Sequence, residues 1–173
     1  MNEQLDELPA ALRRRLDEMA VQIGHGVGGT TGADVGRQAA SRFVAWMTDT
    51  WTQTMTRDEH GVFVITGDIP AMWLRDSSAQ LWPFLTMCDL PEVRHRICGV
   101  IARQWHCIGV DPYANAFNPG PTGAHFDEDD LDLADELWER KYEVDSLAFC
   151  VDLAWRYWHC LLYTSDAADD LLC

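Results

Sequence analysis

The sequence predicts an all-α fold with one short β-hairpin inserted between helices. Of the 173 residues, 47% are apolar and 24% are charged, which supplies enough apolar material for a globular core. Apolar residues recur at helical spacing in five separate segments. Only residues 62–65 form a run typical of a β-strand, and they predict the hairpin.

The first helix is expected over residues 8–23. Its apolar face consists of Leu8, Leu12, Leu16, Met19 and Ile23. The glycine-rich stretch over residues 24–32 is expected to end this helix and to act as a flexible link. The stretch also matches the G-x-G-x-x-G pattern of dinucleotide-binding proteins, but a helix and not a strand precedes it, which argues against a cofactor role.

The second and third helices begin at residues suited to helix N-termini. Asp34 is expected to cap a helix over residues 35–54, whose apolar positions are Val35, Ala39, Phe43, Trp46, Met47 and Thr50. Asp76 or Ser77 is expected to start a third helix that runs to about Thr86. Pro83 should bend or break it because proline lacks the backbone N–H group.

The fourth helix is expected over residues 91–109, with Pro91 at its first position. Its predicted buried stripe contains Val93, Ile97, Val100, Ile101, Trp105 and Ile108. Residues 110–136 carry prolines, glycines and an acidic run, so they are expected to form a loop. A fifth helix over 143–159 follows, with Leu147, Ala148, Val151, Trp155 and Trp158 on its apolar side.

Charge and cysteine usage exclude several classes of protein. The 13 basic and 28 acidic residues give a net charge of −15, which argues against nucleic acid and anionic membrane surfaces as partners. No apolar run is long enough for a signal peptide or a membrane span, so we expect a cytoplasmic location. The six cysteines lack C-x-x-C pairs and are expected to be thiols in the core.

The last residues differ in character from the helix that precedes them. Residues 160–169 read CLLYTSDAAD, which resembles the translation of a transposase adaptor used to prepare DNA for sequencing. We therefore expect residues 160–173 to be a non-native tail. The natural open reading frame is then expected to be truncated near His159.

Two loop-to-helix junctions, residues 66–77 and 137–146, place polar side chains among bulky apolar ones. Asp, Arg and Trp in one loop suit a pyranose, which offers vicinal hydroxyls to charged groups and a C–H face to an aromatic ring. The same residues also fit structural ion pairs, Arg75 with Asp76 and Arg140 with Glu143, which tie loops to helix starts. Spacing alone leaves both interpretations open.

Three ordered motifs help to choose between a sugar-binding pocket and structural ion pairs. They are GDIPAMWLRDSSAQ at residues 67–80, DPYANAFN at 111–118 and WERKYEVDS at 138–146. Together they resemble glycoside hydrolase family 125, and the resemblance covers roughly residues 35–159. It implies a metal-independent exo-α-1,6-mannosidase on an (α/α)6 barrel, which needs no cofactor and inverts the anomeric configuration.

The resemblance also implies which residues bind the substrate, a mannose-containing oligosaccharide or glycan. The pocket for the terminal mannose would be lined by Asp68, Trp73, Arg75, Asp76, Asn115, Asn118, Arg140 and Glu143. Among them, Arg75 and Asp76 are favoured most, because a helix N-terminus beside them adds directed N–H donors.

The catalytic pair has no counterpart here. In the family these are an aspartate acid and a glutamate base in the later part of the barrel, and no position in residues 1–159 matches them. The resemblance thus divides the chain into an N-terminal helix and link (1–33), a partial barrel (34–159) and the tail (160–173). We expect the fragment to be inactive, and two alternatives stay open.

The first alternative is a non-catalytic mannose-binding module. The second is a broken fragment that leaves Trp155 and Trp158 exposed. A metal site is not expected, because His95, Cys98, His106 and Cys107 lack the paired spacing of zinc ligands.

Overall fold

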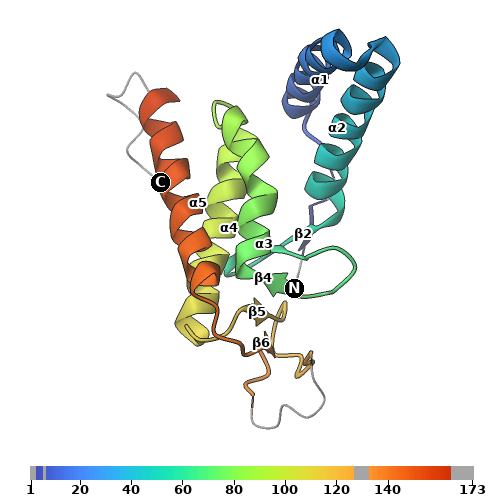
Figure 1. The fold of residues 1–173 in the computed structure, drawn as a ribbon. Helices are drawn as coiled ribbons and strands as arrows, with labels where there is room; N and C mark the ends of the chain where they lie inside the picture. The colour runs from blue at the N-terminus through green and yellow to red at the C-terminus, as the bar shows by residue number, and fades with distance from the viewer. Residues whose placement is uncertain (1–2, 6, 127–132, 165–173) are drawn as a thin grey trace. The chain divides into compact units, whose positions relative to one another are not determined.

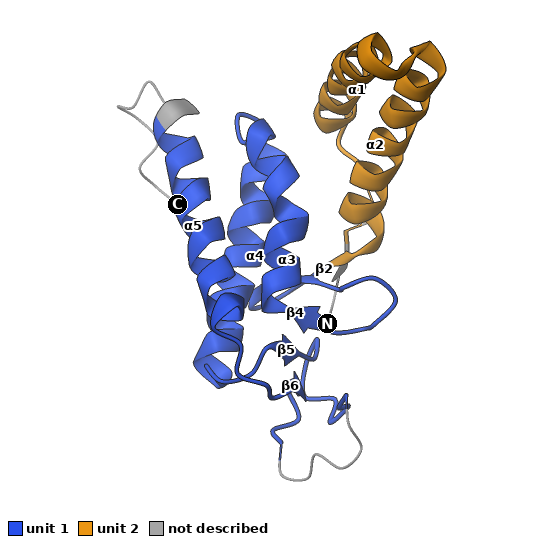
Figure 2. Ribbon diagram, in the orientation of Figure 1, with its two compact units in different colours: residues 1–4, 56–173 blue, residues 5–55 orange. Residues whose placement is uncertain are grey.

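The computed structural model of the chain describes residues 3–5, 7–126 and 133–164 (Figure 1). The chain divides into two compact units, which Figure 2 distinguishes by colour. Unit 2 consists of residues 5–55, and unit 1 of residues 1–4 and 56–173. Within the described ranges, no helix has both the length and the apolar character needed to cross a membrane.

Unit 2 is a helical hairpin of α1 (Ala10–Thr31) and α2 (Ala33–Gln53). Leu12 and Leu16 of α1 and Trp51 of α2 are completely or almost completely buried. The indole Nε1 of Trp51 donates a hydrogen bond to the carbonyl of Glu7, 3.0 Å away, and this contact ties the segment before α1 to the end of α2.

The expected link at residues 24–32 is wrong, because α1 continues through these glycines to Thr31. Gly24 and Gly28 contact Gly36 of α2 at very short range. A Cβ atom on Gly36 would lie 2.3 Å from the carbonyl oxygen of Gly24 and 2.8 Å from the Cα of Gly28. Glycine is therefore required for close packing of the two helices, and the chain turns only at Gly32, where φ is +102°.

The start of α2 also differs from the prediction. Gly32 and not Asp34 occupies the N-cap position, and Asp34 lies in the first turn, where its carboxylate pairs with Arg37. The buried face of α2 is rotated as well, since Val35 and Trp46 are exposed whereas Gly36 and Met47 are buried.

Unit 1 contains α3 (Leu74–Leu81), the 3-10 helix η1 (Trp82–Met87), α4 (Pro91–Val110) and α5 (Val144–Thr164). Helices α3, α4 and α5 lie side by side (Figure 1). The third helix tightens into the 3-10 form where Pro83 occurs, and α4 begins at Pro91, so both proline-based predictions are confirmed. Helix α5 extends beyond its expected end at residue 159.

The predicted buried stripe of α4 is only partly right. Val93, Ile97 and Val100 are buried, but Trp105 is 48% exposed, and Arg103 and Gln104 are buried instead. Polar contacts explain the rotation of the helix. Gln104 Nε2 donates to the hydroxyl oxygens of two α3 serines, 2.9 and 2.8 Å away, and Arg103 pairs with a buried aspartate of the hairpin.

The predicted hairpin is present as β2 (Met55–Asp58) and β3 (Gly61–Val64), with the short strand β1 (Glu3–Gln4) antiparallel to β2. Strand β3 packs against α4. A Cβ atom on Gly61, whose φ is +132°, would lie 2.3 Å from the carbonyl oxygen of Gly99. A larger residue at position 61 would push the hairpin away from the helix.

A second sheet was not expected from the sequence. Strands β4 (Met72–Trp73), β5 (Ala116–Phe117) and β6 (Leu137–Glu139) pair antiparallel in that order. Each is too short to show an alternating pattern. The expectation of a single β-prone run is therefore incomplete, although the described part of the chain is helix-rich, as predicted.

A hydrophobic cluster lies where this sheet meets the helices. It contains Leu74, Cys107, Ala114, Phe117, Leu137 and Cys150. The expected place of the cysteines in the core is confirmed for Cys88, Cys107 and Cys150, whereas Cys98 and Cys160 are only partly buried and Cys173 lies outside the described residues. Burial raises the pKa of Cys107 to about 11 and that of Cys150 to about 12, so both stay protonated at neutral pH.

Candidate functional site

The sheet β4–β5–β6 brings the two polar loop-to-helix junctions together. The backbone N–H of Leu74, at the start of α3, donates to the carbonyl of Asn115, 3.0 Å away. The N–H of Asn115 donates in turn to the carbonyl of Glu139, 3.3 Å away. The N-terminal ends of α3 and α5 therefore meet around Asn115, although the junctions are some 70 residues apart in the chain.

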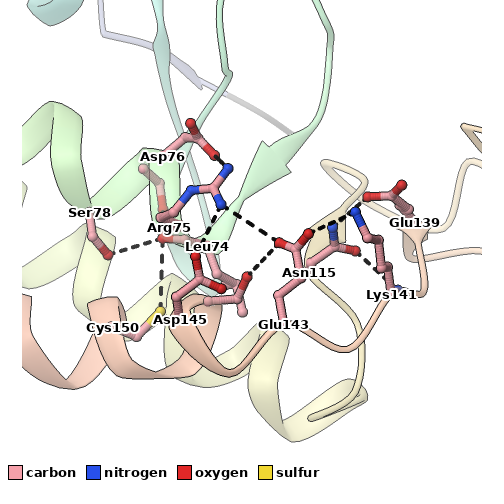
Figure 3. A network of polar contacts seen from close by, with 12 residues as sticks. Leu74, Arg75, Asp76, Ser78, Asn115, Glu139, Lys141, Glu143, Asp145 and Cys150 are labelled. Carbon is pink, nitrogen blue, oxygen red and sulfur yellow. Dashed lines mark hydrogen bonds and ion pairs between the residues drawn. The ribbon is translucent and has the colours of Figure 1, made fainter.

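Arg75 lies at the centre of this arrangement, where three carboxylates surround its guanidinium group (Figure 3). Its Nη1 lies 3.1 Å from Asp145 Oδ2 and 3.9 Å from Glu143 Oε2, and its Nη2 lies 3.5 Å from Asp76 Oδ2. The side chain is still 41% exposed. One face of the cation is therefore held by protein while part of it stays open to a ligand.

The charges of this cluster stabilise one another. The hydrogen bond with Asp145 and the charge of Asp76 raise the pKa of Arg75. The same hydrogen bond lowers the pKa of Asp145 below its ordinary value. Both groups therefore stay ionised over a wide pH range.

A second part of the cluster surrounds Glu143. Its Oε1 lies 3.0 Å from Lys141 Nζ, and Ser146 Oγ donates to its Oε2 across 3.4 Å. The backbone N–H of Lys141 donates to Asn115 Oδ1, 3.2 Å away, and the Asn115 amide donates to the carboxylate of Glu139. We call the whole group the Arg75 network, which comprises Arg75, Asp76, Asn115, Glu139, Lys141, Glu143 and Asp145.

The structure brings four of the predicted mannose-binding residues into this network: Arg75, Asp76, Asn115 and Glu143. Trp73 lies next to them in β4 and is half-buried. Asp68 is exposed, in the turn that a bridge between Thr66 and Ile69 closes.

The other two predicted residues lie outside the network. Asn118 is only 2% exposed, and its Nδ2 lies within hydrogen-bond reach of the carbonyls of Ala124, Asp135 and Leu137, at 2.8, 2.8 and 3.2 Å. Arg140 donates from Nε to Asp111 Oδ2, 2.6 Å away, and its guanidinium group lies over the ring of Tyr113. The alternative ion pair of Arg140 with Glu143 is replaced by the one with Asp111, whereas the Arg75–Asp76 pair is present.

Sequence reasoning missed three members of the network, namely Glu139, Lys141 and Asp145. All three belong to the WERKYEVDS motif at residues 138–146. Asp145 carried a further signal, since an acidic residue in the first turn of a helix favours interactions at its N-terminus.

A separate pocket of about 450 Å³ lies between the β2–β3 turn, the C-terminal half of α4 and residues 117–121. The rings of His60 and His106 stack there at 3.7 Å, and Arg103 pairs with Asp58 at 2.5 Å. Burial lowers the pKa of His106. Asn118 is the one predicted site residue that lines this pocket, and no member of the Arg75 network does so.

Neither region brings together a set of metal ligands. Among the residues that the structure describes, no three His, Cys, Asp or Glu side chains are arranged to hold a metal ion. The chemistry that the Arg75 network offers is hydrogen bonding by charged donors and acceptors, which suits the hydroxyl groups of a sugar.

Comparisons with known proteins point in the same direction. The model of the family described as metal-independent alpha-mannosidase (GH125) matches residues 37–170. The chain is 38% identical over 131 residues to the meiotically up-regulated gene 157 protein of Schizosaccharomyces pombe, with 68% of this chain and 25% of that protein covered.

A solved structure gives a similar match. It is a Streptococcus pneumoniae protein from a family of metal-independent alpha mannosidases, in a non-productive substrate complex with α-1,6-mannobiose. The TM-score is 0.76 at 39% identity, over 86% of this chain and 33% of the other. The chain thus spans about a quarter to a third of the length of these relatives.

Proposed function

Because the chain belongs to glycoside hydrolase family 125, we propose that it is part of an exo-acting mannosidase that removes terminal α-1,6-linked mannose with inversion. The observation that carries this proposal is the Arg75 network. It gathers charged donors and acceptors at the starts of α3 and α5, and the central guanidinium group is partly open. The relative solved with α-1,6-mannobiose supports the choice of sugar and linkage.

In this proposal, Arg75 and Asp76 bind vicinal hydroxyls of the non-reducing mannose, with Asn115 and Glu143 beside them. An arginine presents several N–H donors in a fixed plane, and a carboxylate accepts from two hydroxyls at once, so such a pair fixes the orientation of a ring. Trp73 and Asp68 belong to the loop that leads into α3 and are proposed to complete the rim.

Asn118 and Arg140 are proposed to support this rim from outside. The Asn118 amide connects the segment after β5 to the one before β6, and Arg140 connects the end of β6 to the loop after α4. The Arg140 contact holds the loop that carries Asn115 of the network.

Inverting hydrolysis needs a carboxylic acid and a carboxylate about 6.5–9.5 Å apart, with a water between the carboxylate and the sugar. We propose that the longer protein supplies this pair and completes an (α/α)6 barrel, of which residues 34–159 are the N-terminal part. Support comes from relatives of which the matched part of this chain covers only 25% and 33%, and from the exposed apolar side of α5. Residues 160–173 are still predicted to be non-native.

The first experiment is a long read of the genomic locus through the codon for His159, from DNA prepared without transposase adaptors. A frame that continues past His159 gives the complete protein, which we expect to hydrolyse α-1,6-mannobiose. If the frame ends at Cys173, or if the complete protein binds mannose without turnover, the hydrolase proposal fails. A mannose-binding module is then the remaining function.

Substitution of Arg75 tests the site itself. In the complete protein, Arg75→Ala should lower kcat/KM for α-1,6-mannobiose by about 100-fold, since a charged hydrogen bond to the sugar is lost. The free energy of unfolding should fall by only about 1 kcal/mol or less, because partly exposed ion pairs contribute little.

The matched control for this test is Arg156→Ala. Arg156 is also half-exposed and pairs with Asp152 at 2.6 Å, but it lies outside the network. Equal losses of activity in the two variants, or a loss of activity that follows the loss of stability, would contradict the assigned role of Arg75.

A further inference from the structure

The position of the Arg75 guanidinium group depends on a few contacts. Arginine side chains have many rotamers, and fixing one of them costs conformational entropy. Arg75 is partly exposed, so packing alone does not fix it. Its carboxylate partners therefore decide whether its N–H groups are aimed at a ligand.

Asp145 is the partner at the shortest distance. Its Oδ2 accepts a hydrogen bond from Arg75 Nη1 across 3.1 Å, and it belongs to the first turn of α5, whereas Arg75 belongs to α3. The contact therefore connects the N-terminal ends of two helices. Figure 3 shows Asp145 between the α5 backbone and the guanidinium group.

The other two carboxylates hold Arg75 less firmly. Asp76 is the next residue on the same helix and lies 3.5 Å away, so it does not fix Arg75 against α5. Glu143 lies 3.9 Å from Nη1, beyond hydrogen-bond distance, and is engaged by Lys141 at 3.0 Å.

Asp145 is itself held in place. It lies at the N-terminus of α5, where backbone N–H groups and the helix dipole favour a carboxylate. The backbone N–H groups of Asp145 and Ser146 lower its pKa, in addition to the larger effect of Arg75. A fixed carboxylate is a suitable anchor for a flexible cation.

We propose that Asp145 is a positioning residue, which fixes the Arg75 guanidinium group between α3 and α5 so that its open side faces the terminal sugar. This inference rests on the proposed function. Asp145 itself is not assigned a contact with the substrate. Misplacement of a binding group by about 1 Å is enough to reduce rates about 100-fold, so loss of the anchor is expected to matter.

The kinetic test compares Asp145→Ala, Asp145→Asn and Asp152→Ala in the complete protein. In Asp145→Ala, KM for α-1,6-mannobiose should rise about 10-fold or more, with a smaller change in kcat, because sugar binding is impaired. Asp145→Asn should recover part of the loss, since its amide oxygen still accepts from Nη1. Asp152→Ala removes an ion pair of the same helix and should leave KM unchanged.

The second readout does not depend on activity. Complete protein with ¹⁵N-labelled arginine gives an Nε–Hε signal for Arg75, identified by its absence in Arg75→Ala. Asp145→Ala should increase the ps–ns mobility of this signal. Asp152→Ala should leave it unchanged.

The two readouts separate the two proposals. If Arg75 gains mobility only in Asp145→Ala while wild-type protein has no mannosidase activity, the positioning role stands and the proposed function fails. If Asp145→Ala changes neither KM nor the mobility of Arg75, the positioning role is overturned. A lower melting temperature with unchanged KM and unchanged Arg75 mobility also overturns it, because Asp145 then acts only on stability.

Discussion

Asn115 and Asn118 lie three residues apart and have different roles. Asn115 takes part in the Arg75 network through its Oδ1 and its amide. The Asn118 side-chain amide faces three backbone carbonyls, and the backbone carbonyl of Asn118 accepts a hydrogen bond from Arg103 Nη2 across 3.3 Å. Its almost completely buried side chain therefore links two loop segments through their backbone carbonyls.

Substitution of Asn118 should therefore act on stability. Asn118→Ala should lower the free energy of unfolding by about 1–3 kcal/mol, because the hydrogen bonds of a buried amide are lost. Asn118→Asp should cost more, since a carboxylate of the same size would face those carbonyls without a donor. Urea unfolding monitored by circular dichroism measures both values. If both variants are as stable as wild type, the amide has no structural role.

At the scale of elements, the glycines of α1 and α2 determine how closely the helices of unit 2 pack. Gly36 touches the α1 backbone at Gly24 and Gly28, whereas a Cβ on Gly26 would have no neighbour within 4 Å. All of these positions are helical, so alanine should gain helix propensity at each of them. Whether alanine raises or lowers the stability of the protein then depends on whether the added Cβ atom meets a neighbouring backbone atom.

Gly36→Ala and Gly26→Ala form a matched pair. Gly26→Ala should stabilise the protein by up to about 1 kcal/mol, through helix propensity alone. Gly36→Ala should destabilise it by about 1–3 kcal/mol, because the added methyl group overlaps backbone atoms. Thermal unfolding of both variants tests this difference. Equal effects would show that close packing at Gly36 contributes nothing to stability.

At the scale of the whole molecule, the main feature is an uncovered apolar side of α5. Val151, Trp155 and Trp158 are 53, 54 and 53% exposed, and Val144, Leu147 and Trp155 are among the residues that line a shallow groove there. Exposure of Trp155 and Trp158 is what the sequence predicts for a fragment. Contiguous apolar surface of this kind favours association in water.

We therefore expect the 173-residue chain to self-associate at micromolar concentration. The double variant Trp155→Gln/Trp158→Gln should reduce association, measured by light scattering, while its helical circular dichroism is retained. Trp105→Gln is the control, because Trp105 is similarly exposed but lies on α4. A wild-type chain that stays monomeric and does not bind a hydrophobic dye would contradict this prediction.

Local sequence determined much of the secondary structure. The periodic apolar residues of α4 and α5 predicted both helices, since helical spacing is a property of neighbouring residues. Pro83 and Pro91 marked the 3-10 segment and the start of α4. The three motifs at 67–80, 111–118 and 138–146 identified the family and contained every member of the Arg75 network.

Tertiary contacts decided the rest. Gln104 turns α4 toward Ser77 and Ser78. Gly24 and Gly28 stay helical because Gly36 packs on them. Asp145 reaches the Arg75 network, whereas Arg140 pairs with Asp111 outside it. Strands β4, β5 and β6 have two or three residues each and exist only as partners of one another. Each of these features depends on the energy of contacts between residues far apart in sequence, which no local pattern contains.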